Sequence, residues 1–277
     1  MRIDSHQHFW QASRGDYYWM TPAVPILNRD YFPDDLRPHL AKHRIDKTIL
    51  VQAAPTVAET DFLLDLAQRH DFVGAVVGWL DMESDDFAKQ FEDYRRKAKF
   101  GGLRPMLQDL PDDAYIVRPR VVESLKLVAA LDFPFDFLTY TRHLPYVLQV
   151  LDKVPNLRAV VDHISKPEIK TQRVAPWKSL IHEVAHHKNV YCKLSGMITE
   201  ADHGSWTPDH LRLYVQHVVE CFGLDRVMFG SDWPVCLRAG TYDRVIEALH
   251  AILRPILDRA SEAAVFGLNA ERFYKVV

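Results

Sequence analysis

The chain begins Met1-Arg2-Ile3-Asp4-Ser5-His6-Gln7-His8, and this stretch carries the first information about the fold. Its composition predicts a β-strand over Arg2–His8. Side chains alternate between the two faces of a strand, so His6 and His8 point to the same side. If that side faces solvent, the pair has little meaning. If it faces the inside of a closed sheet, two imidazoles converge on one small volume.

Further segments of the chain favour the closed sheet. Seven of them are short apolar runs bounded by Gly, Pro or Asp, as is typical of buried parallel strands: Thr48–Ala54, Phe72–Leu80, Gly101–Leu107, Phe133–Tyr140, Leu157–His163, Val190–Ser195 and Arg226–Ser231. Amphipathic segments between them predict helices: Glu59–His70, Asp85–Lys99, Pro119–Leu131, His143–Val154, Trp177–His187, a helix that begins at Thr207, Tyr242–Leu257 and Ser261–Tyr274. Eight alternating units predict an α/β fold, a single (β/α)8 TIM-type barrel domain over residues 1–277. The alternative, an open doubly wound sheet, is disfavoured because no glycine-rich phosphate-binding motif follows any predicted strand.

The segment between the first two predicted strands, Phe9 to Lys47, is long and rich in aromatic residues and proline. Long loops in compact domains are usually lids or binding loops. We therefore predict an extended first βα loop that forms part of a lid over the barrel mouth.

The composition excludes several classes of protein. The chain has 277 residues, of which 48% are hydrophobic and 26% charged, and a net charge of −3, so it lacks the basic balance typical of nucleic-acid-binding proteins. Its three cysteines, Cys192, Cys221 and Cys236, form no CxxC pair, which favours a reducing compartment over a disulfide framework. Neither a signal peptide nor an apolar run approaching 18 residues is found, so we expect a cytoplasmic protein without a membrane partner.

Polar side chains stand at the ends of nearly all the predicted strands. In a barrel of this kind the active site lies at the carboxyl ends of the strands. The groups found there are His6 and His8, Gln52, Trp79 and Asp81, Arg104, Asp136 and Tyr140, Asp162 and His163, Lys193 and Ser195, and Asp232. Each one alone has an ordinary structural explanation, such as a turn or a solvated strand end. Together they predict an active site, because one barrel mouth would collect them all.

Five motifs occur in a characteristic order: Asp4–Trp10 (DSHQHFW), Val161–Pro167 (VDHISKP), Lys193–Gly196 (KLSG), Phe229–Pro234 (FGSDWP) and Gly267–Ala270 (GLNA). In these motifs the chain resembles the amidohydrolase superfamily, and within it the sugar-lactone hydrolase branch. That branch includes L-fuconolactonase-like and L-rhamnonolactonase-like members and is related to pyrone dicarboxylate lactonase. The resemblance implies a hydrolase that opens an aldonolactone ring, most closely L-fuconolactone or a relative, to the sugar acid.

The residue types suit that reaction. Asp232 is the candidate general base, and we expect burial at the top of the eighth strand to raise its pKa. The imidazoles of His6, His8 and His163 could polarise the carbonyl or stabilise the oxyanion. The remaining candidates are expected to bind the sugar: Gln52, Arg104, Lys193, Arg142, His143, Trp10, Trp19 and Trp233.

A metal ion is a separate question. His6, His8 and Asp232 together form a plausible three-ligand set for one Zn²⁺. A two-metal site is disfavoured, since the two-metal members of the superfamily that this chain resembles have a lysine at the fourth strand end, where this chain has Arg104. One-metal members usually add a histidine at the fifth strand end, whereas here His143 comes three residues after Tyr140. The lactonase branch implies that no metal is essential, so we expect at most an opportunistic Zn²⁺ at the histidine cluster.

Two other functions stay open. The first is a Zn²⁺-dependent non-oxidative decarboxylase on the same barrel, which would use the same histidines and Asp232 in a flatter, more apolar pocket. The second is a sugar-binding protein that has lost catalysis, although the base and the histidines are all in place. The sequence does not identify the particular lactone or its ring size, and it leaves a homo-oligomeric state open.

Overall fold

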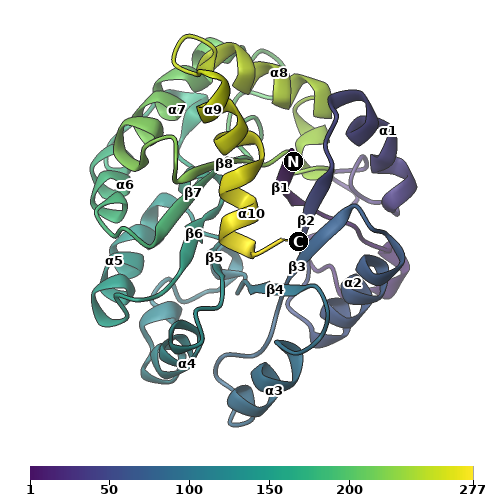
Figure 1. The fold of residues 1–277 in the computed structure, drawn as a ribbon, viewed down its shortest axis with the longest axis vertical. Helices are drawn as coiled ribbons and strands as arrows, with labels where there is room; N and C mark the ends of the chain where they lie inside the picture. Colours follow the sequence, from purple (N-terminus) through teal and green to yellow (C-terminus); the bar gives the residue numbers. More distant parts are fainter. Residues whose placement is uncertain (277) are drawn as a thin grey trace.

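The computed structural model describes residues 1–276, whose strands pair in parallel and in chain order from β1 to β8. The strands are β1 (Ile3–Gln7), β2 (Lys47–Val51), β3 (Val73–Gly78), β4 (Phe100–Leu103), β5 (Phe135–Phe137), β6 (Ala159–Val161), β7 (Val190–Leu194) and β8 (Val227–Phe229). Figure 1 shows them around a common centre with helices outside. Each lies within or beside its predicted segment, so the fold prediction is confirmed. Most of the observed strands are shorter because several polar groups at the predicted ends, such as Gln52, Arg104 and Asp162, already lie outside the strands.

The first and last strands complete the barrel. Gln7 forms a parallel bridge with Trp233. The His8 amide donates a hydrogen bond to the Trp233 carbonyl at 2.7 Å, and the Asp232 amide donates to the His6 carbonyl at 2.8 Å. This closure excludes the open doubly wound sheet. It also holds the first strand's histidines against the loop that carries Asp232.

The helices fall between the strands, as the alternation predicts. They are α1 (Pro33–His43), α2 (Val57–Arg69), α3 (Phe87–Tyr94), α4 (Pro119–Ala130), α5 (Leu144–Lys153), α6 (Trp177–Ala185), α7 (Pro208–Phe222), α8 (Tyr242–Leu253), α9 (Arg259–Ala263) and α10 (Asn269–Tyr274). Local sequence fixes where several begin. At α2, for example, the Thr56 hydroxyl accepts a hydrogen bond from the Glu59 amide at 3.0 Å, which satisfies an otherwise unpaired helix N–H. None of the helices described is long and apolar enough to cross a membrane.

Two predicted segments differ from the structure. The stretch from Phe9 to Lys47 is not all loop, since α1 occupies Pro33–His43; proline in its first turn and the Asp35 carboxylate, which accepts from the Phe32 amide at 2.8 Å, start that helix. The predicted helix Ser261–Tyr274 is divided by a π-helical turn at Ala264–Leu268. There Gly267 passes so close to Met1 that a Cβ would lie 2.0 Å from the Met1 carbonyl oxygen.

The barrel interior is closed at one end. Apolar side chains from the strands, among them Ile3, Val77 and Met228, pack with Phe273 and Tyr274 of α10. In Figure 1, α10 lies across the centre of the barrel. A ligand can therefore enter only at the opposite end, where the strands finish and where residues 9–32 pass over the mouth.

Candidate active site

The two histidines of the first strand converge as the alternation requires. Their Nε2 atoms lie 3.2 Å apart, and both rings are buried. The Nδ1 atom of His8 is 2.8 Å from the Val51 carbonyl. Because a carbonyl only accepts, this Nδ1 carries a hydrogen and donates it. The Nε2 atom of His8 therefore faces the barrel mouth.

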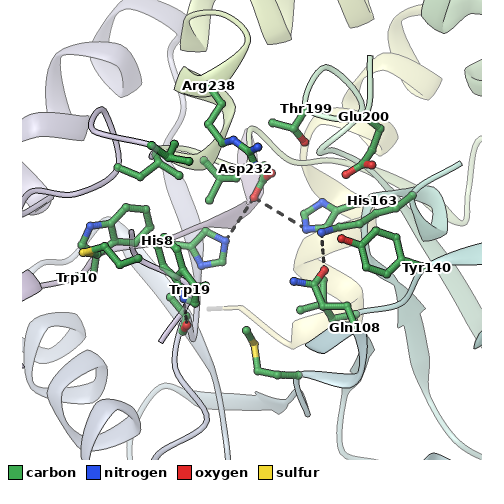
Figure 2. Close-up of a pocket in the computed structure, with 18 of the residues that line it drawn as sticks. His8, Trp10, Trp19, Gln108, Tyr140, His163, Thr199, Glu200, Asp232 and Arg238 are labelled. Carbon is green, nitrogen blue, oxygen red and sulfur yellow. Dashed lines mark hydrogen bonds and ion pairs between the residues drawn. The ribbon is translucent and has the colours of Figure 1, made fainter. Parts of the chain in front are cut away.

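Asp232 approaches this pair from the loop after β8. Its φ of +57° places it in the left-handed region, and this turn brings the carboxylate back over the barrel. Its Oδ1 atom lies 3.3 Å from His8 Nε2, 3.9 Å from His6 Nε2 and 3.9 Å from His163 Nε2. Figure 2 shows the carboxylate between His8 and His163. One carboxylate oxygen thus faces three imidazoles.

The pKa of Asp232 is shifted in the direction opposite to the one expected from the sequence. Burial by itself raises the pKa, but the surrounding imidazoles of His163, His8 and His6 outweigh it and hold the pKa below its ordinary value. The expectation considered burial alone and left out the interactions of the carboxylate with the three histidines. Asp232 is therefore a carboxylate throughout the neutral range.

His163 is placed by an unusual backbone. Four consecutive residues, His163 to Lys166, have positive φ values between 45° and 61°. The kink is held by Trp177, whose indole N–H donates to the Ile164 carbonyl at 2.7 Å. Ser195 Oγ lies 2.9 Å from His163 Nδ1. Burial lowers the pKa of His163 to about 4, although Asp232 opposes the shift, so this imidazole is neutral at pH 7.

Behind these groups lies a buried ionic network. The Lys193 ammonium is fully buried and lies 2.6 Å from Asp136 and 3.0 Å from Asp162. Arg104 contacts Asp162 at 3.0 Å, and the Tyr274 hydroxyl donates to Asp136 at 2.8 Å. Two buried cations thus face two buried carboxylates, as the cost of burying charge requires.

The network also determines the charge of His6. Burial lowers the pKa of His6 well below its usual range; the nearby ammonium of Lys193 adds to this, and Asp162 opposes it. The Nδ1 atom of His6 lies 3.2 Å from Lys193 Nζ and 3.4 Å from Asp162 Oδ1. His6 is consequently a neutral imidazole held between two charges.

A cavity of about 340 Å³ opens above Asp232. Its volume lies within the range of small-molecule sites, about 300–1,000 Å³. Its apolar lining side chains, called the apolar wall below, are Trp10, Trp19, Met20, Val24, Leu27, Met106, Leu138 and Val235. Its polar lining side chains, called the polar wall, include Gln108, Tyr140, Lys166, Thr199, Glu200 and Arg238; Figure 2 shows Tyr140 and Glu200 across from Trp10 and Trp19. The cavity suits a small molecule with one apolar and one hydroxylated side.

Six of the candidates from the sequence line this cavity: His8, Trp10, Trp19, Arg104, His163 and Asp232. His6 lies directly behind His8 and is fully buried. Trp10 and Trp19 belong to residues 9–32, so the first βα loop supplies part of the cavity wall, as a lid would.

The other five candidates do not line this cavity. Gln52 is buried and donates to the Arg104 carbonyl at 2.7 Å, and Lys193 belongs to the ionic network. Trp233 is buried against Phe9 and Tyr31. The remaining two, Arg142 and His143, contact Asp113 instead, each at 3.0 Å. A position at a strand end does not by itself distinguish the inner layers of a barrel from its open mouth.

The polar wall contains residues that the strand-end argument missed, because they come from loops. Lys166 is the last residue of the kink that begins at His163, and it donates from Nζ to the Gln108 side chain. Glu200 follows β7, and Arg238 follows β8. Partial burial raises the pKa of Glu200, and the nearby Lys166 opposes the rise. Lys166 could have been found from the sequence, since it lies within the Val161–Pro167 motif, whereas Glu200 and Arg238 carry no comparable signal.

The donor set fits a metal ion. His6, His8 and Asp232 each offer an atom, and these atoms all lie within 4.8 Å of one another. His8 donates from Nδ1 to the Val51 carbonyl, so the lone pair on its Nε2 is free to bind a metal ion placed among these atoms, as is typical of ligating histidines. Two imidazoles, one carboxylate and an open side toward the cavity match a catalytic zinc site. The structure thus contains a His/Asp cluster that could bind a metal.

Known proteins resemble this chain over nearly its whole length. Residues 3–276 match the amidohydrolase family model. An L-fucono-1,5-lactonase of Burkholderia ambifaria is 42% identical over 99% of this chain and 96% of its own length. An L-fucono-1,5-lactonase of Burkholderia multivorans is 36% identical over the same shares. The crystal structure of a Burkholderia multivorans amidohydrolase with bound zinc superposes with a TM-score of 0.96, at 35% identity and with both chains covered completely.

Proposed function

The chain belongs to the amidohydrolase family, and we propose that it hydrolyses the ring ester of L-fucono-1,5-lactone. The observation that carries the proposal is the position of Asp232, whose carboxylate lies against His8 and His163 beneath the cavity. The two lactonases that resemble the whole chain supply the substrate. Every group used below comes from the one barrel, so we propose that residues 1–277 act as one domain.

The cavity walls are consistent with this substrate. A 6-deoxyaldonolactone carries a methyl group on one side and hydroxyl groups around the ring. The apolar wall with Trp10 and Trp19 would cover the methyl group and the ring face. The opposite wall would bind the hydroxyls, with Lys166 as a donor and Glu200 as an acceptor. A flat aromatic acid would leave this polar wall unpaired, which disfavours the decarboxylase that the sequence left open.

Asp232 would act as the general base. Since it is ionised at neutral pH, it can accept a proton from water as the water oxygen attacks the lactone carbonyl carbon. The same carboxylic acid would then return the proton to the ring oxygen as the carbon–oxygen bond breaks. The product is an open-chain hydroxy acid, which releases one proton to the medium at neutral pH.

His163 and Arg104 would stabilise the oxyanion. The Ser195 hydroxyl can donate to His163 Nδ1, which leaves the hydrogen of the neutral ring on Nε2, the nitrogen nearer to Asp232. An Nε2–H group there can donate to the negative charge that develops on the carbonyl oxygen. The guanidinium of Arg104 lines the same cavity and supplies a fixed positive charge.

The role of a metal ion in this reaction is a separate proposal. A Zn²⁺ would be held by His6, His8 and Asp232, where it would lower the pKa of a water molecule and polarise the carbonyl. We propose that hydrolysis does not depend on it, because Arg104 and His163 already place positive or hydrogen-donating groups at the cavity.

The test is proton release, followed with a pH indicator, on L-fucono-, L-rhamnono-, L-galactono- and D-arabinono-lactones. We expect the fastest release above the spontaneous rate with L-fucono-1,5-lactone. If the folded protein accelerates none of them, the proposal is wrong. Carbon dioxide release from a dihydroxybenzoate by the Zn²⁺-loaded protein would then favour the decarboxylase.

A further inference from the structure

The backbone at the end of β2 holds three side chains of the candidate active site. Three consecutive carbonyl oxygens each accept a hydrogen bond from one of them: Val51 from His8 Nδ1 at 2.8 Å, Gln52 from the Arg104 guanidinium, and Ala53 from the Trp19 indole N–H at 2.7 Å. All three donors line the cavity, and they come from three different parts of the chain. The geometry of the cavity therefore depends on the orientation of this one segment, residues 51–54.

Glu59 contacts the same segment from outside the cavity. It lies in the first turn of α2 and is fully buried. Its Oε1 atom accepts from the Ala53 amide at 3.0 Å, and its Oε2 atom accepts from the Ala54 amide at 2.9 Å. In a capping box a glutamate at this helix position would accept from the Thr56 amide, but here that amide donates to the Ala54 carbonyl at 2.9 Å. The carboxyl group thus binds the segment and does not cap its own helix.

Planar peptide units connect the two sides of the segment. In a trans peptide the C=O and the N–H of one unit point in opposite directions. The Gln52 carbonyl and the Ala53 N–H belong to one unit, and the Ala53 carbonyl and the Ala54 N–H belong to the next. Glu59 therefore binds one edge of two peptide units whose other edge accepts from side chains of the cavity.

We propose that Glu59 is a positioning residue for the hydrolysis, because it orients the two peptide units that hold Arg104 and Trp19. The inference rests on the proposed function, in which Arg104 stabilises the oxyanion and Trp19 covers the ring face. A misplacement of about 1 Å in an active site can cost about a hundredfold in rate. Removal of Glu59 should therefore impair the reaction, although this residue does not line the cavity.

Three variants of Glu59 test the role of its oxygen atoms. Glu59→Ala removes both acceptors, and Glu59→Asp keeps an acid but withdraws it by one methylene group. Glu59→Gln is the conservative variant: burial raises the pKa of Glu59 to about 8, so the side chain is largely uncharged at pH 7, as glutamine is. Its single acceptor oxygen can serve both amides, because Oε2 of Glu59 lies 3.1 Å from the Ala53 nitrogen and 2.9 Å from the Ala54 nitrogen.

Asn269→Ala is the matched control. It removes another buried polar side chain that binds two backbone groups, the carbonyls of Leu224 and Val227 at 2.8 and 2.7 Å. These groups lie before and within β8, away from the cavity. The control therefore loses stability without a change in the segment after β2.

Two measurements are made on each full-length variant, and melting curves check that it is folded. The first is kcat and KM for L-fucono-1,5-lactone. The second is the ¹H–¹⁵N signal of the Trp19 indole in protein labelled with ¹⁵N-tryptophan, assigned with Trp19→Phe. The indoles of Trp177 and Trp206 donate to carbonyls elsewhere and serve as internal references. This second measurement does not depend on activity.

We expect Glu59→Ala and Glu59→Asp to lose about tenfold or more in kcat/KM, with a shifted Trp19 signal that exchanges faster with water. Glu59→Gln should keep most of the activity, and Asn269→Ala should melt at a lower temperature with unchanged kinetics. The inference is overturned if the folded Ala and Asp variants keep the wild-type kcat/KM and Trp19 signal, if the control loses as much kcat/KM, or if Glu59→Gln is no more active than Glu59→Asp. A wild-type protein that hydrolyses no lactone would overturn the proposed function, and the Trp19 signal would still decide whether Glu59 orients the segment.

Discussion

Replacing Lys193 by Met separates a structural role from a role in substrate binding. The side chain is fully buried and lies 2.6 Å from Asp136 and 3.0 Å from Asp162. Methionine keeps the length and the apolar stem of the side chain but removes the charge. The substitution therefore leaves two buried carboxylates: Asp162 keeps its contacts with Arg104 and His6, and Asp136 keeps the hydrogen bond from the Tyr274 hydroxyl.

The size of the effect follows from these distances. At an effective dielectric constant of about 20, two unit charges about 3 Å apart attract each other by about 6 kcal/mol. The cost of burying the ammonium offsets part of this attraction, so removing one partner of a buried pair typically destabilises a protein by about 3–5 kcal/mol. For a chain of this length, at about 2 °C per kcal/mol, that loss lowers the melting temperature by about 6–10 °C.

The assay is thermal unfolding at pH 7, with Lys126→Met as the matched control. Lys126 forms an ion pair of similar length, 2.7 Å to Glu123, but both side chains are exposed, so this variant should lose at most about 1 kcal/mol. If Lys193→Met melts with the control and instead raises KM for the lactone, the reasoning is refuted. Lys193 would then contact the substrate, as the strand-end argument first suggested.

Three further predictions concern the cavity. Because burial lowers the pKa of His163 to about 4 and the imidazoles hold the pKa of Asp232 below its ordinary value, neither group titrates between pH 8 and about pH 5; kcat/KM should stay level over that range, and a fall centred near 6.5 would contradict this. Lys166→Met should raise KM at least about tenfold through loss of a charged hydrogen bond to the substrate, whereas Arg142→Met, outside the cavity, should leave KM unchanged; equal effects would refute the assignment of the polar wall. Dialysis against a chelator, with the metal content measured, should leave most of the lactonase activity, and complete loss restored by Zn²⁺ would show that the metal is essential.

The sequence was most informative where the physical rule is short-range. Alternation along one strand places His6 beside His8, and the rule that barrel sites lie at strand ends points to Asp232. The pKa of Asp232 was predicted with the wrong sign, because it depends on three imidazoles that only the folded barrel brings to one carboxylate. A sum of opposing contributions of this kind cannot be evaluated from one residue and its burial.

The other differences between the predicted and observed positions of site residues have a common cause in long-range placement. Gln52 and Lys193 do stand at strand ends, but they belong to inner layers of the barrel and contact other protein groups. Glu200 and Arg238 reach the cavity only because the loops after β7 and β8 fold over it. Tyr274, on α10 at the closed end of the barrel, donates a hydrogen bond to Asp136. The two residues are 138 positions apart in the sequence, so no local pattern indicates this contact.

The most direct test of the central claim is the turnover of L-fucono-1,5-lactone by the wild-type protein and by Asp232→Asn, with the spontaneous rate subtracted. The variant keeps the size and shape of the side chain but removes the base. We expect rapid hydrolysis by the wild-type protein, an unchanged melting profile in the variant, and a fall in kcat of about a hundredfold or more. A folded variant that turns over as fast as the wild type would contradict the role of Asp232, and a wild-type protein that does not exceed the spontaneous rate would contradict the lactonase itself.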